Sequence, residues 1–394
     1  MTNEVLQKTP SDEQNVSSSN GLEPKSPLLR FRKFTHPWRL EKLSDFTSRI
    51  MRKNSNNETE LPLTISSKDG LVDQVIFFNK KVSSKDMSGY YLLKNGEFAY
   101  NKSYSNGYDF GSIKRLERYE MGALSTLYIC FSLKKHCSDY IKHYFDSLKW
   151  YRQIYVISAE GARNHGLLNV PTDDFFATTH FLSPDIEEQQ KIADFLSLVD
   201  RRIEKQRQLV ESLKKYKRGA LSRVFNDILE TVKLSDISNF ISSARTLSTT
   251  LNSNKGIYPV FDATGIAGYI DHYDIDSDYI TIVKDGSGVG RLQRCDKKSS
   301  FIGTLGALVA KNCTTDFLYA VLQTIDFSKF VIGMAIPHIY YRDYKSILLP
   351  FPCEEKQHFI SQLFKKFDIH IENETKKLTN MLAYKQGLLQ QMFI

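Results

Sequence analysis

The sequence predicts an α/β (α+β) protein. Two globular domains are separated by two long antiparallel coiled-coil helices, arranged as a pseudo-two-fold internal repeat. Three observations predict this. A stretch that begins at Pro184 recurs without a gap at Pro352, 168 positions later, and such repeats reveal the architecture. Both copies have a helical apolar pattern, whereas the residues between them differ and contain short strand-like runs. A chain of 394 residues is also too long for one core.

Residues 1–33 are predicted to be a disordered polar N-terminal tail. The stretch "MTNEVLQKTPSDEQNVSSSNGLEPKSP" lacks the apolar core of a signal peptide. Elsewhere no apolar run approaches the roughly 18 residues that span a membrane. Five cysteines, an odd number without a C-x-x-C pair, are typical of reduced thiols rather than a disulfide framework. We therefore expect a cytoplasmic protein that does not contact a membrane.

Residues 34–183 and 231–351 are predicted to form the two globular domains. Each opens on the same motif, since "KLSD" at 42–45 recurs at 233–236. In the second domain, the β-rich run 279–283 precedes "DGSGVGR" (285–291), so we expect a hairpin tip there. In the first, a strand through 98–100 leads into a polar, tyrosine-bearing loop.

Residues 184–230 and 352–394 are predicted to be long helices, because each begins at a proline and contains a single glycine near its end. Apolar residues recur in alternating steps of four and three, the seam of a coiled coil. Its members are Ile192, Leu196, Val199, Ile203, Gln206, Val210 and Leu213 in the first copy, and Ile360, Phe364, Phe367, Ile371, Glu374, Leu378 and Met381 in the second.

Both seams place a polar residue at the same position, Gln206 and Glu374, which can fix the alignment of the two helices. A helix of about 36 residues would extend about 54 Å. If the repeats are related by a two-fold axis, such helices would hold the two domains at opposite ends. The alternative is two unrelated surface helices, each packed on its own domain.

The chain lacks the motifs of the enzyme classes that its composition would permit. It contains no Gly-Lys dipeptide and so no Walker-type phosphate loop, and no Pro-Pro pair, which the N/D-P-P-aromatic motif of DNA methyltransferases requires. The glycine-rich run 286–290 is not followed by the helix of a dinucleotide site. His136, Cys137 and His143 do not make a convincing ligand set. We expect no catalytic residues and no metal.

The chain resembles the specificity subunit of type I restriction–modification systems from about residue 34 to residue 394. The resemblance is carried by two copies of P-x-x-E-x-Q-x-x-I…D-x-x-I-E…Y-K-x-G-x-L-x-x-x-F, with "WRLEKLSD" (38–45), "GEFAYNK" (96–102) and "GSGVGR" (286–291). One departure is Lys356, where the first copy has Glu188. We expect this difference to alter only a surface charge.

The resemblance implies that residues 34–183 and 231–351 are target recognition domains. Each would read one half of a bipartite sequence in double-stranded DNA. It also implies that the helices set the spacing and dock two modification (methyltransferase) subunits. Those partners would carry S-adenosylmethionine and methylate adenine at N6, and two restriction (endonuclease and translocase) subunits would use ATP and magnesium. The chain itself would need no cofactor.

Candidate DNA contacts follow from the polar loops and from the net charge of +8. Lysine and arginine pair with phosphate or guanine, and asparagine and serine can read base edges. The candidates are Asn101, Lys102, Ser103, Tyr104, Lys114 and Arg115 in the first domain, and Lys284, Ser287, Arg291 and Arg294 in the second. Two rivals are a structural coiled-coil adaptor without DNA readout and an enzyme that binds a nucleotide at the glycine turn. Neither accounts for two dissimilar modules with basic loops and no catalytic motif.

Overall fold

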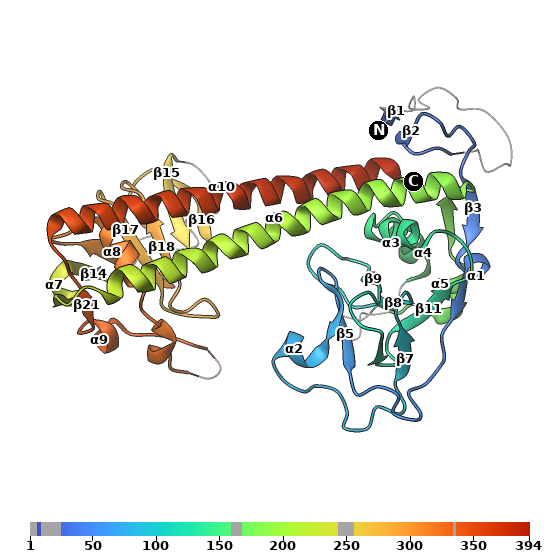
Figure 1. Ribbon diagram of the computed structural model, residues 1–394, viewed down its shortest axis with the longest axis horizontal. Helices are drawn as coiled ribbons and strands as arrows, with labels where there is room; N and C mark the ends of the chain where they lie inside the picture. Colours follow the sequence, from blue (N-terminus) through green and yellow to red (C-terminus); the bar gives the residue numbers. More distant parts are fainter. Residues whose placement is uncertain (1–5, 9–24, 159–167, 243–255, 334–335) are drawn as a thin grey trace. The chain divides into compact units, whose positions relative to one another are not determined.

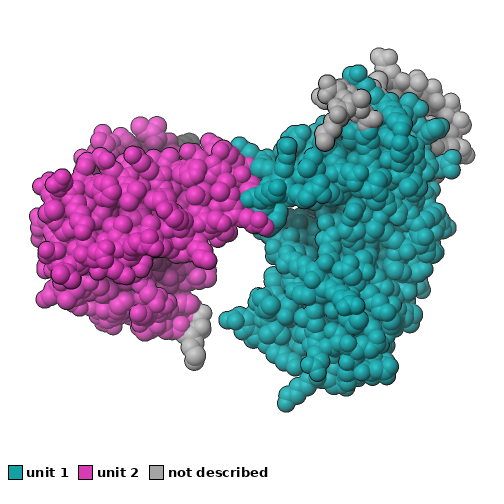
Figure 2. Space-filling model, viewed as in Figure 1, with its two compact units in different colours: residues 1–205, 379–394 teal, residues 206–378 magenta. Residues whose placement is uncertain are grey.

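A computed structural model describes residues 6–8, 25–158, 168–242, 256–333 and 336–394. The chain is mixed α/β and divides into two compact units (Figure 2). Unit 1 comprises residues 1–205 together with 379–394, and unit 2 comprises residues 206–378. Most of the predicted tail lies outside the described residues.

Unit 1 contains two four-stranded sheets with the strand orders β6-β5-β10-β7 and β4-β11-β8-β9, and the small pairs β12-β3 and β1-β2 (Figure 1). Most neighbours are antiparallel, but β10 runs parallel to β5. The strands are β1 (Leu6–Lys8), β2 (Leu29–Phe31), β3 (Arg39–Lys42), β4 (Thr47–Arg49), β5 (Pro62–Ser66), β6 (Gly70–Asp73), β7 (Tyr91–Lys94), β8 (Phe98–Asn101), β9 (Ser112–Arg115), β10 (Met121–Leu124), β11 (Ile129–Leu133) and β12 (Thr179–Leu182). The short helices are α1 (Leu43–Phe46), α2 (Gln74–Phe78), α3 (Ser138–Asp146), α4 (Tyr151–Ile157) and α5 (Thr172–Ala177).

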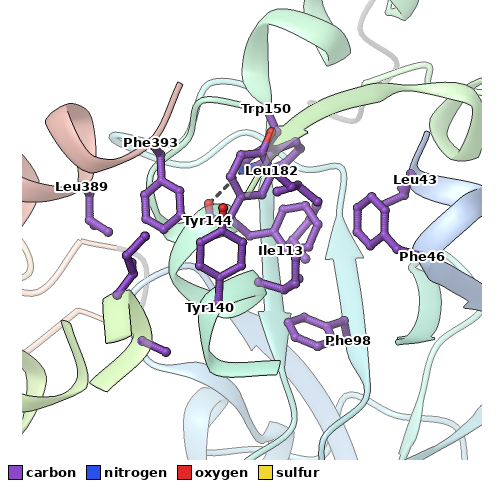
Figure 3. Packing of buried hydrophobic residues seen from close by; sticks show 14 of the residues in the cluster. Leu43, Phe46, Phe98, Ile113, Tyr140, Tyr144, Trp150, Leu182, Leu389 and Phe393 are labelled. Atoms are coloured by element: carbon purple, nitrogen blue, oxygen red, sulfur yellow. Dashed lines mark hydrogen bonds between the residues drawn. The ribbon is translucent and has the colours of Figure 1, made fainter. Parts of the chain in front are cut away.

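The main core of unit 1 is aromatic (Figure 3). Trp150 is fully buried and its indole Nε1–H donates to the carbonyl of Phe145 over 2.8 Å, which satisfies the one polar atom of that ring. Phe393, from the end of the chain, packs its ring 5.4 Å from Tyr140 and 5.8 Å from Tyr144. Residues from both ends of the described chain therefore close this core.

Residues 25–38 cover the start of the first long helix. Arg30 Nε and Nη2 donate to the two carboxylate oxygens of Glu188 over 2.6 and 2.9 Å, and Trp38 Nε1 donates to the same carboxylate over 3.2 Å. Arg30 is 3% exposed and Glu188 is fully buried. Two expectations need correction here. Residues 25–33 are ordered against the helix rather than part of the tail, and Glu188 is a buried ion-pair partner rather than a surface charge.

Unit 2 contains a four-stranded sheet of order β14-β20-β17-β18, a three-stranded sheet of order β16-β15-β19, and the pair β13-β21. Its strands are β13 (Thr231–Lys233), β14 (Ser238–Ile241), β15 (Tyr258–Asp262), β16 (Gly265–Ile270), β17 (Tyr279–Val283), β18 (Leu292–Cys295), β19 (Ser300–Phe301), β20 (Leu305–Ala310) and β21 (Leu348–Pro350). Its short helices are α7 (Leu234–Ile237), α8 (Thr315–Leu322), η2 (Phe327–Phe330) and α9 (Tyr341–Tyr344). Strand β17, with the aromatic and β-branched sequence YITIV, is buried along its whole length, as expected for a central strand.

The two units begin in the same way. The repeated "KLSD" motif forms a strand that leads into a single helical turn, β3–α1 in unit 1 and β13–α7 in unit 2. In each unit, the hydroxyl of the first residue after the turn donates a hydrogen bond to the carbonyl of the first residue of the turn. Thr47 Oγ1 donates to the carbonyl of Leu43 over 2.6 Å, and Ser238 Oγ donates to that of Leu234 over 2.8 Å. The shared motif is therefore a shared local structure.

The two long helices are α6 (Ile186–Asn226) and α10 (Glu354–Met392), as the sequence predicts (Figure 1). Acidic residues occupy the first turn of each, where the helix dipole favours negative charge. Inside unit 1, Leu389 and Phe393 join the cluster that contains Leu196 of α6. Inside unit 2, Leu221 and Phe225 of α6 join the cluster that contains Ile360. Each unit therefore buries apolar residues of both helices.

Candidate nucleic-acid interface

The glycine-rich turn of unit 2 is a hairpin tip. Strands β17 and β18 pair antiparallel, with Ile282 opposite Leu292, and residues 284–291 connect them. Gly290 has a φ of 84°, and a Cβ there would lie 2.7 Å from the Cβ of Phe327. Only glycine fits this position without displacing the neighbouring residue. The glycines therefore shape a tight turn and do not cradle a phosphate at the start of a helix.

Three of the four candidates in unit 2 lie at this tip. Arg291 and Ser287 are exposed, and Arg291 Nη1 donates to the carbonyl of Ala263 over 3.2 Å. Lys284 Nζ donates to the carbonyl of Ser242 over 2.7 Å, and partial burial lowers the pKa of Lys284. A backbone carbonyl does not neutralise either cation, but the exposed carboxylate of Asp285 opposes the lowering of the Lys284 pKa, so the tip presents two positive charges, one negative charge and a hydroxyl.

The fourth candidate, Arg294, is engaged inside the unit. Its guanidinium contacts three carboxylates, those of Asp316 at 2.6 Å and of Asp278 and Asp296 at 2.8 Å each. This arrangement joins β18 to the first turn of α8. Three carboxylates more than neutralise one guanidinium, so Arg294 is placed to hold the hairpin rather than to attract a polyanion.

In unit 1 the candidates from 101 to 104 lie in the loop that follows β8. Asn101 Oδ1 accepts a hydrogen bond from the backbone N–H of Ser103 over 3.0 Å, a local turn that asparagine favours. The carbonyl of Lys102 accepts from the N–H of Leu168 over 3.1 Å. Tyr104 is 51% exposed, whereas the three residues before it are half-buried. The structure thus brings these four residues together in one ordered loop.

Lys114 and Arg115 lie on β9, outside the loop 101–104, and both form ion pairs. Lys114 Nζ lies 2.7 Å from Asp146, and Arg115 lies 2.6 Å from Glu117 and 2.5 Å from Asp139. The side chains of Lys114 and Arg115 are only 15% and 13% exposed. Both residues therefore connect β9 to α3.

Lys114 belongs to a buried charge network that ends on the long helices. Lys385 of α10 lies 2.6 Å from Asp200 of α6 and 3.8 Å from Asp146. Burial by itself raises the pKa of Asp146, but the ammonium groups of Lys114 and Lys385 outweigh that effect and lower it to about 2. The carboxylate therefore stays ionised at neutral pH and ties α3 to both long helices.

The lysine–aspartate pair between the two long helices also occurs in unit 2, at positions that differ by 168 residues from those in unit 1. Lys217 Nζ of α6 contacts Asp368 of α10, and it also donates to Gln323 Oε1 over 2.6 Å. Lys217 corresponds to Lys385 and Asp368 to Asp200. Gln323 is neutral, and this lysine has one carboxylate partner where Lys385 has two. The repeated Y-K-x-G motif thus supplies a lysine that pairs with the aspartate of the repeated D-x-x-I-E motif.

The predicted seam residues face inward. Each of them is buried or half-buried, whereas most residues between them are exposed. The two polar members contact each other, because Gln206 Nε2 donates to the carboxylate of Glu374 over 2.7 Å and to its backbone carbonyl over 3.0 Å. A half-buried glutamine with these partners is satisfied in only one alignment of the helices.

No group of three histidine, cysteine, aspartate or glutamate side chains among the described residues is arranged to hold a metal ion. Within the same residues, no helix is both long and apolar enough to cross a bilayer. Each described cysteine is a free thiol.

The comparisons with known proteins agree with the resemblance. A sequence model of the family "Type I restriction modification DNA specificity domain" matches residues 226–382. These residues are therefore similar to a type I DNA specificity domain. The sequence-based recognition of a type I specificity subunit is confirmed. A search of the curated proteins found no match.

Solved structures share the fold of the specificity domain and of the rest of the chain. The S subunit of a type I restriction–modification system from M. genitalium superimposes with a TM-score of 0.56 at 16% identity, over 94% of this chain and 99% of that one. A chain from a study of complex assembly and conformational transition of the type I R-M system gives 0.52 at 16% identity, over 90% and 97%. At this identity the likeness establishes the fold.

Proposed function

We propose that the chain is a non-catalytic specificity subunit that reads a bipartite DNA sequence, one half through residues 34–183 and the other through residues 231–351. The observation that carries the proposal is the repeat. Two copies of one helix, with the same Lys–Asp pair in each unit, join two blocks whose sequences differ, although their four-stranded sheets have corresponding strand orders. Duplicated connectors with different modules suit a protein that joins two independent readings.

The selectivity needed to find one DNA sequence among many supports a two-part target. A single module that reads three or four base pairs would meet its sequence every few hundred base pairs. Each mismatch costs about 1–3 kcal/mol, roughly additively for separate positions, so two modules multiply their selectivity. We propose that helices α6 and α10 pair as an antiparallel coiled coil with pseudo-two-fold symmetry. The coil would fix the number of unread base pairs between the half-sites.

The proposed contacts divide by their chemistry. In unit 2, Lys284, Ser287 and Arg291 at the hairpin tip would contact DNA directly. In unit 1, the loop 101–104 would do so. Lys114, Arg115 and Arg294 are held by carboxylates of the same unit, so we propose that they position these elements instead. Releasing any of them to bind DNA would break the ion pairs that link β9 to α3 or β18 to α8.

The remaining assignments concern partners. We propose that the chain works in the cytoplasm with two modification subunits and two restriction subunits. S-adenosylmethionine would bind to the modification subunits, and ATP with magnesium to the restriction subunits. This chain would then recognise the DNA sequence to be methylated, and the partner subunits would catalyse the methylation of adenine. Exposed apolar residues of the long helices, such as Leu209 at 42% exposure, are candidates for docking the modification subunits.

The test begins with a methylation map. The chain is expressed with its modification subunit in a host that lacks other adenine methylation, and long-read sequencing locates N6-methyladenine. We expect a two-part motif with an unread gap. Replacing residues 231–351 with the corresponding block of another specificity subunit should change one half only. Unmethylated DNA from a complex that co-purifies intact would favour the structural adaptor instead.

Arg291→Ala tests whether the hairpin tip of unit 2 reads only one of the two half-sites. Binding is measured on duplexes in which each half of the mapped target is scrambled in turn. The substitution should weaken reading of the unit 2 half-site about 5- to 150-fold, the equivalent of about 1–3 kcal/mol. Lys366→Ala on α10, an exposed residue away from the hairpin, serves as the matched control. Equal losses for both half-sites would refute the assignment of Arg291.

A further inference from the structure

Helix α2 of unit 1 exposes an apolar surface that the proposed DNA contacts do not use. None of its five residues is buried. Ile76 is 78% exposed, Phe77 48% and Phe78 44%, and Val82 just beyond the helix is 53% exposed. Contiguous exposed apolar surface of this kind marks interaction sites, because in water it carries a free-energy cost that a partner removes.

The helix is held in a defined conformation. The carboxylate of Asp73 accepts from the backbone N–H groups of Val75 and Ile76 over 2.7 and 3.4 Å, which caps the N-terminus. Asn79 ends the helix in the left-handed region with a φ of 51°. The rings of Phe77 and Phe78 pack edge to face with centroids 5.0 Å apart. A helix this short is unstable alone, so the cap and strand β6 before it fix how the apolar side chains are presented.

Uncompensated positive charge lies next to this surface. Lys80, Lys81 and Lys85 are exposed, and none of them has an ion pair or a hydrogen bond to another described residue. Of the nearby carboxylates, that of Asp73 caps the helix and that of Asp86 accepts from the N–H of Ser88. These lysines differ in this respect from Lys114 and Arg115. Their charge is available to an anionic partner.

Two buried polar atoms at the margins of the segment lack a partner. Within the described part of the chain, Gln74 Oε1 and Ser83 Oγ are buried without a hydrogen bond. A buried polar atom without a partner destabilises the free protein, because it has lost its hydrogen bonds to water. The segment from 74 to 85 therefore retains unsatisfied hydrogen-bonding capacity in the free protein, and a small adjustment on binding would relieve that cost.

We propose that residues 74–85, which we call the α2 patch, form a second DNA-contacting element of unit 1. The three lysines would contact backbone phosphates, and Ile76 and Phe77 would pack against apolar base edges, such as the thymine methyl group, or wedge between base pairs. Duplex DNA is the occupant that fits both features, because it offers phosphates to the lysines and apolar base surface to the helix. This inference rests on the proposed function, since it names a further contact of the same DNA-reading unit.

Salt dependence tests the lysines. The full-length chain is titrated against a labelled duplex of random sequence at several salt concentrations. Each phosphate contact contributes about 0.9 to the slope of log Kobs against log [salt], so replacing Lys80, Lys81 and Lys85 with glutamine should reduce that slope by about 2.7. The matched control replaces the exposed Lys356, Lys366 and Lys376 of α10, which changes net charge equally. The control slope should stay at the unaltered value.

The apolar residues are tested on the mapped target. Ile76→Ser with Phe77→Ser should leave the salt slope unchanged and weaken target binding at least about 5-fold, the equivalent of the lower end of the cost of one lost base contact. Tyr155→Ser with Val156→Ser is the matched control, because these side chains of α4 are 70% and 67% exposed in the same unit. Circular dichroism confirms that each variant is folded.

The outcomes are distinguishable. Lysine variants with the control's slope would overturn the proposal. So would α2 variants that bind DNA normally but no longer co-purify with the modification subunit, because the patch would then be a protein docking surface. If the unaltered chain shows no salt-dependent binding to any duplex, the proposed function itself fails and this inference falls with it.

Discussion

The buried pair between Arg30 and Glu188 gives the sharpest test of how unit 1 is held together. The perturbation is Glu188→Gln, which keeps the shape of the side chain and removes its charge. In the folded protein this carboxylate receives hydrogen bonds from Arg30, from Trp38 and from Ser183 Oγ. After the substitution, Arg30 would keep its charge at 3% exposure with only neutral acceptors, namely the new amide oxygen, the carbonyl of His36 and the hydroxyl of Ser26.

The magnitude follows from that burial. Removing one member of a buried ion pair typically costs about 3–5 kcal/mol, because the remaining charge is left uncompensated. That is a large part of the roughly 5–15 kcal/mol by which a domain is stable. The repeat supplies the matched control, since Lys356 occupies the equivalent position of α10 and is exposed. Lys356→Gln should change stability by no more than about 0.5 kcal/mol.

The assay is urea unfolding followed by tryptophan fluorescence. The chain has two tryptophans, and Trp38 and Trp150 are both buried in unit 1, so the signal reports that unit alone. With an m value of about 2–3 kcal/mol per molar urea, Glu188→Gln should lower the midpoint by about 1–2 M. Replacing both Arg30 and Glu188 with apolar residues should recover part of the loss. A midpoint for Glu188→Gln equal to that of Lys356→Gln would refute the reasoning.

Two further predictions use the same signal. Burial lowers the pKa of His143 to about 4 and that of His180 to about 3, below the usual value near 6.5. The unfolded chain binds these protons more readily than the folded one. The free energy of unfolding of unit 1 should therefore be at its full value above pH 6.5 and fall by on the order of 3 kcal/mol per histidine as the pH falls toward 4. Equal urea midpoints at pH 7 and 4.5 would contradict this. Phe393→Ala should destabilise unit 1 by about 3–5 kcal/mol through the cavity left against Trp38 and Tyr140. Phe225→Ala, its equivalent in unit 2, should leave the tryptophan transition in place, and equal shifts for the two variants would count against the packing described.

The features that could be predicted from the sequence are those set by local pattern. The long helices and their inward-facing residues follow from a spacing that is written twice, and the hairpin at 285–291 follows from glycines between two strands. The hydrogen bond between Gln206 and Glu374 also agrees with their equivalent positions in the two predicted seams. In each case the deciding information lies within one stretch, or in the comparison of two copies of it.

The features that escaped prediction depend on contacts between distant residues. Lys114 and Arg115 resemble available cations in the sequence because Asp146 and Asp139 come 32 and 24 residues later and contact them only after α3 packs on β9. Glu188 resembles a surface residue because Arg30 lies 158 positions away. The α2 patch, by contrast, has a local signal in the sequence. In "VIFFNKK" an unbroken apolar run meets two lysines without the alternation of a half-buried strand.

The packing of Leu389 and Phe393 into the core of unit 1 has a consequence for biosynthesis. The ribosome makes most of unit 1 first, then all of unit 2, and only afterwards the residues that close the first core. At about 5–20 residues per second, the roughly 190 residues between Leu196 and Leu388 take about 10 to 40 seconds to translate. During that time Trp38, Tyr140 and Tyr144 lack the ring of Phe393. A nascent chain that has not reached Leu388 therefore keeps this aromatic surface exposed, and transiently exposed hydrophobic surface promotes aggregation.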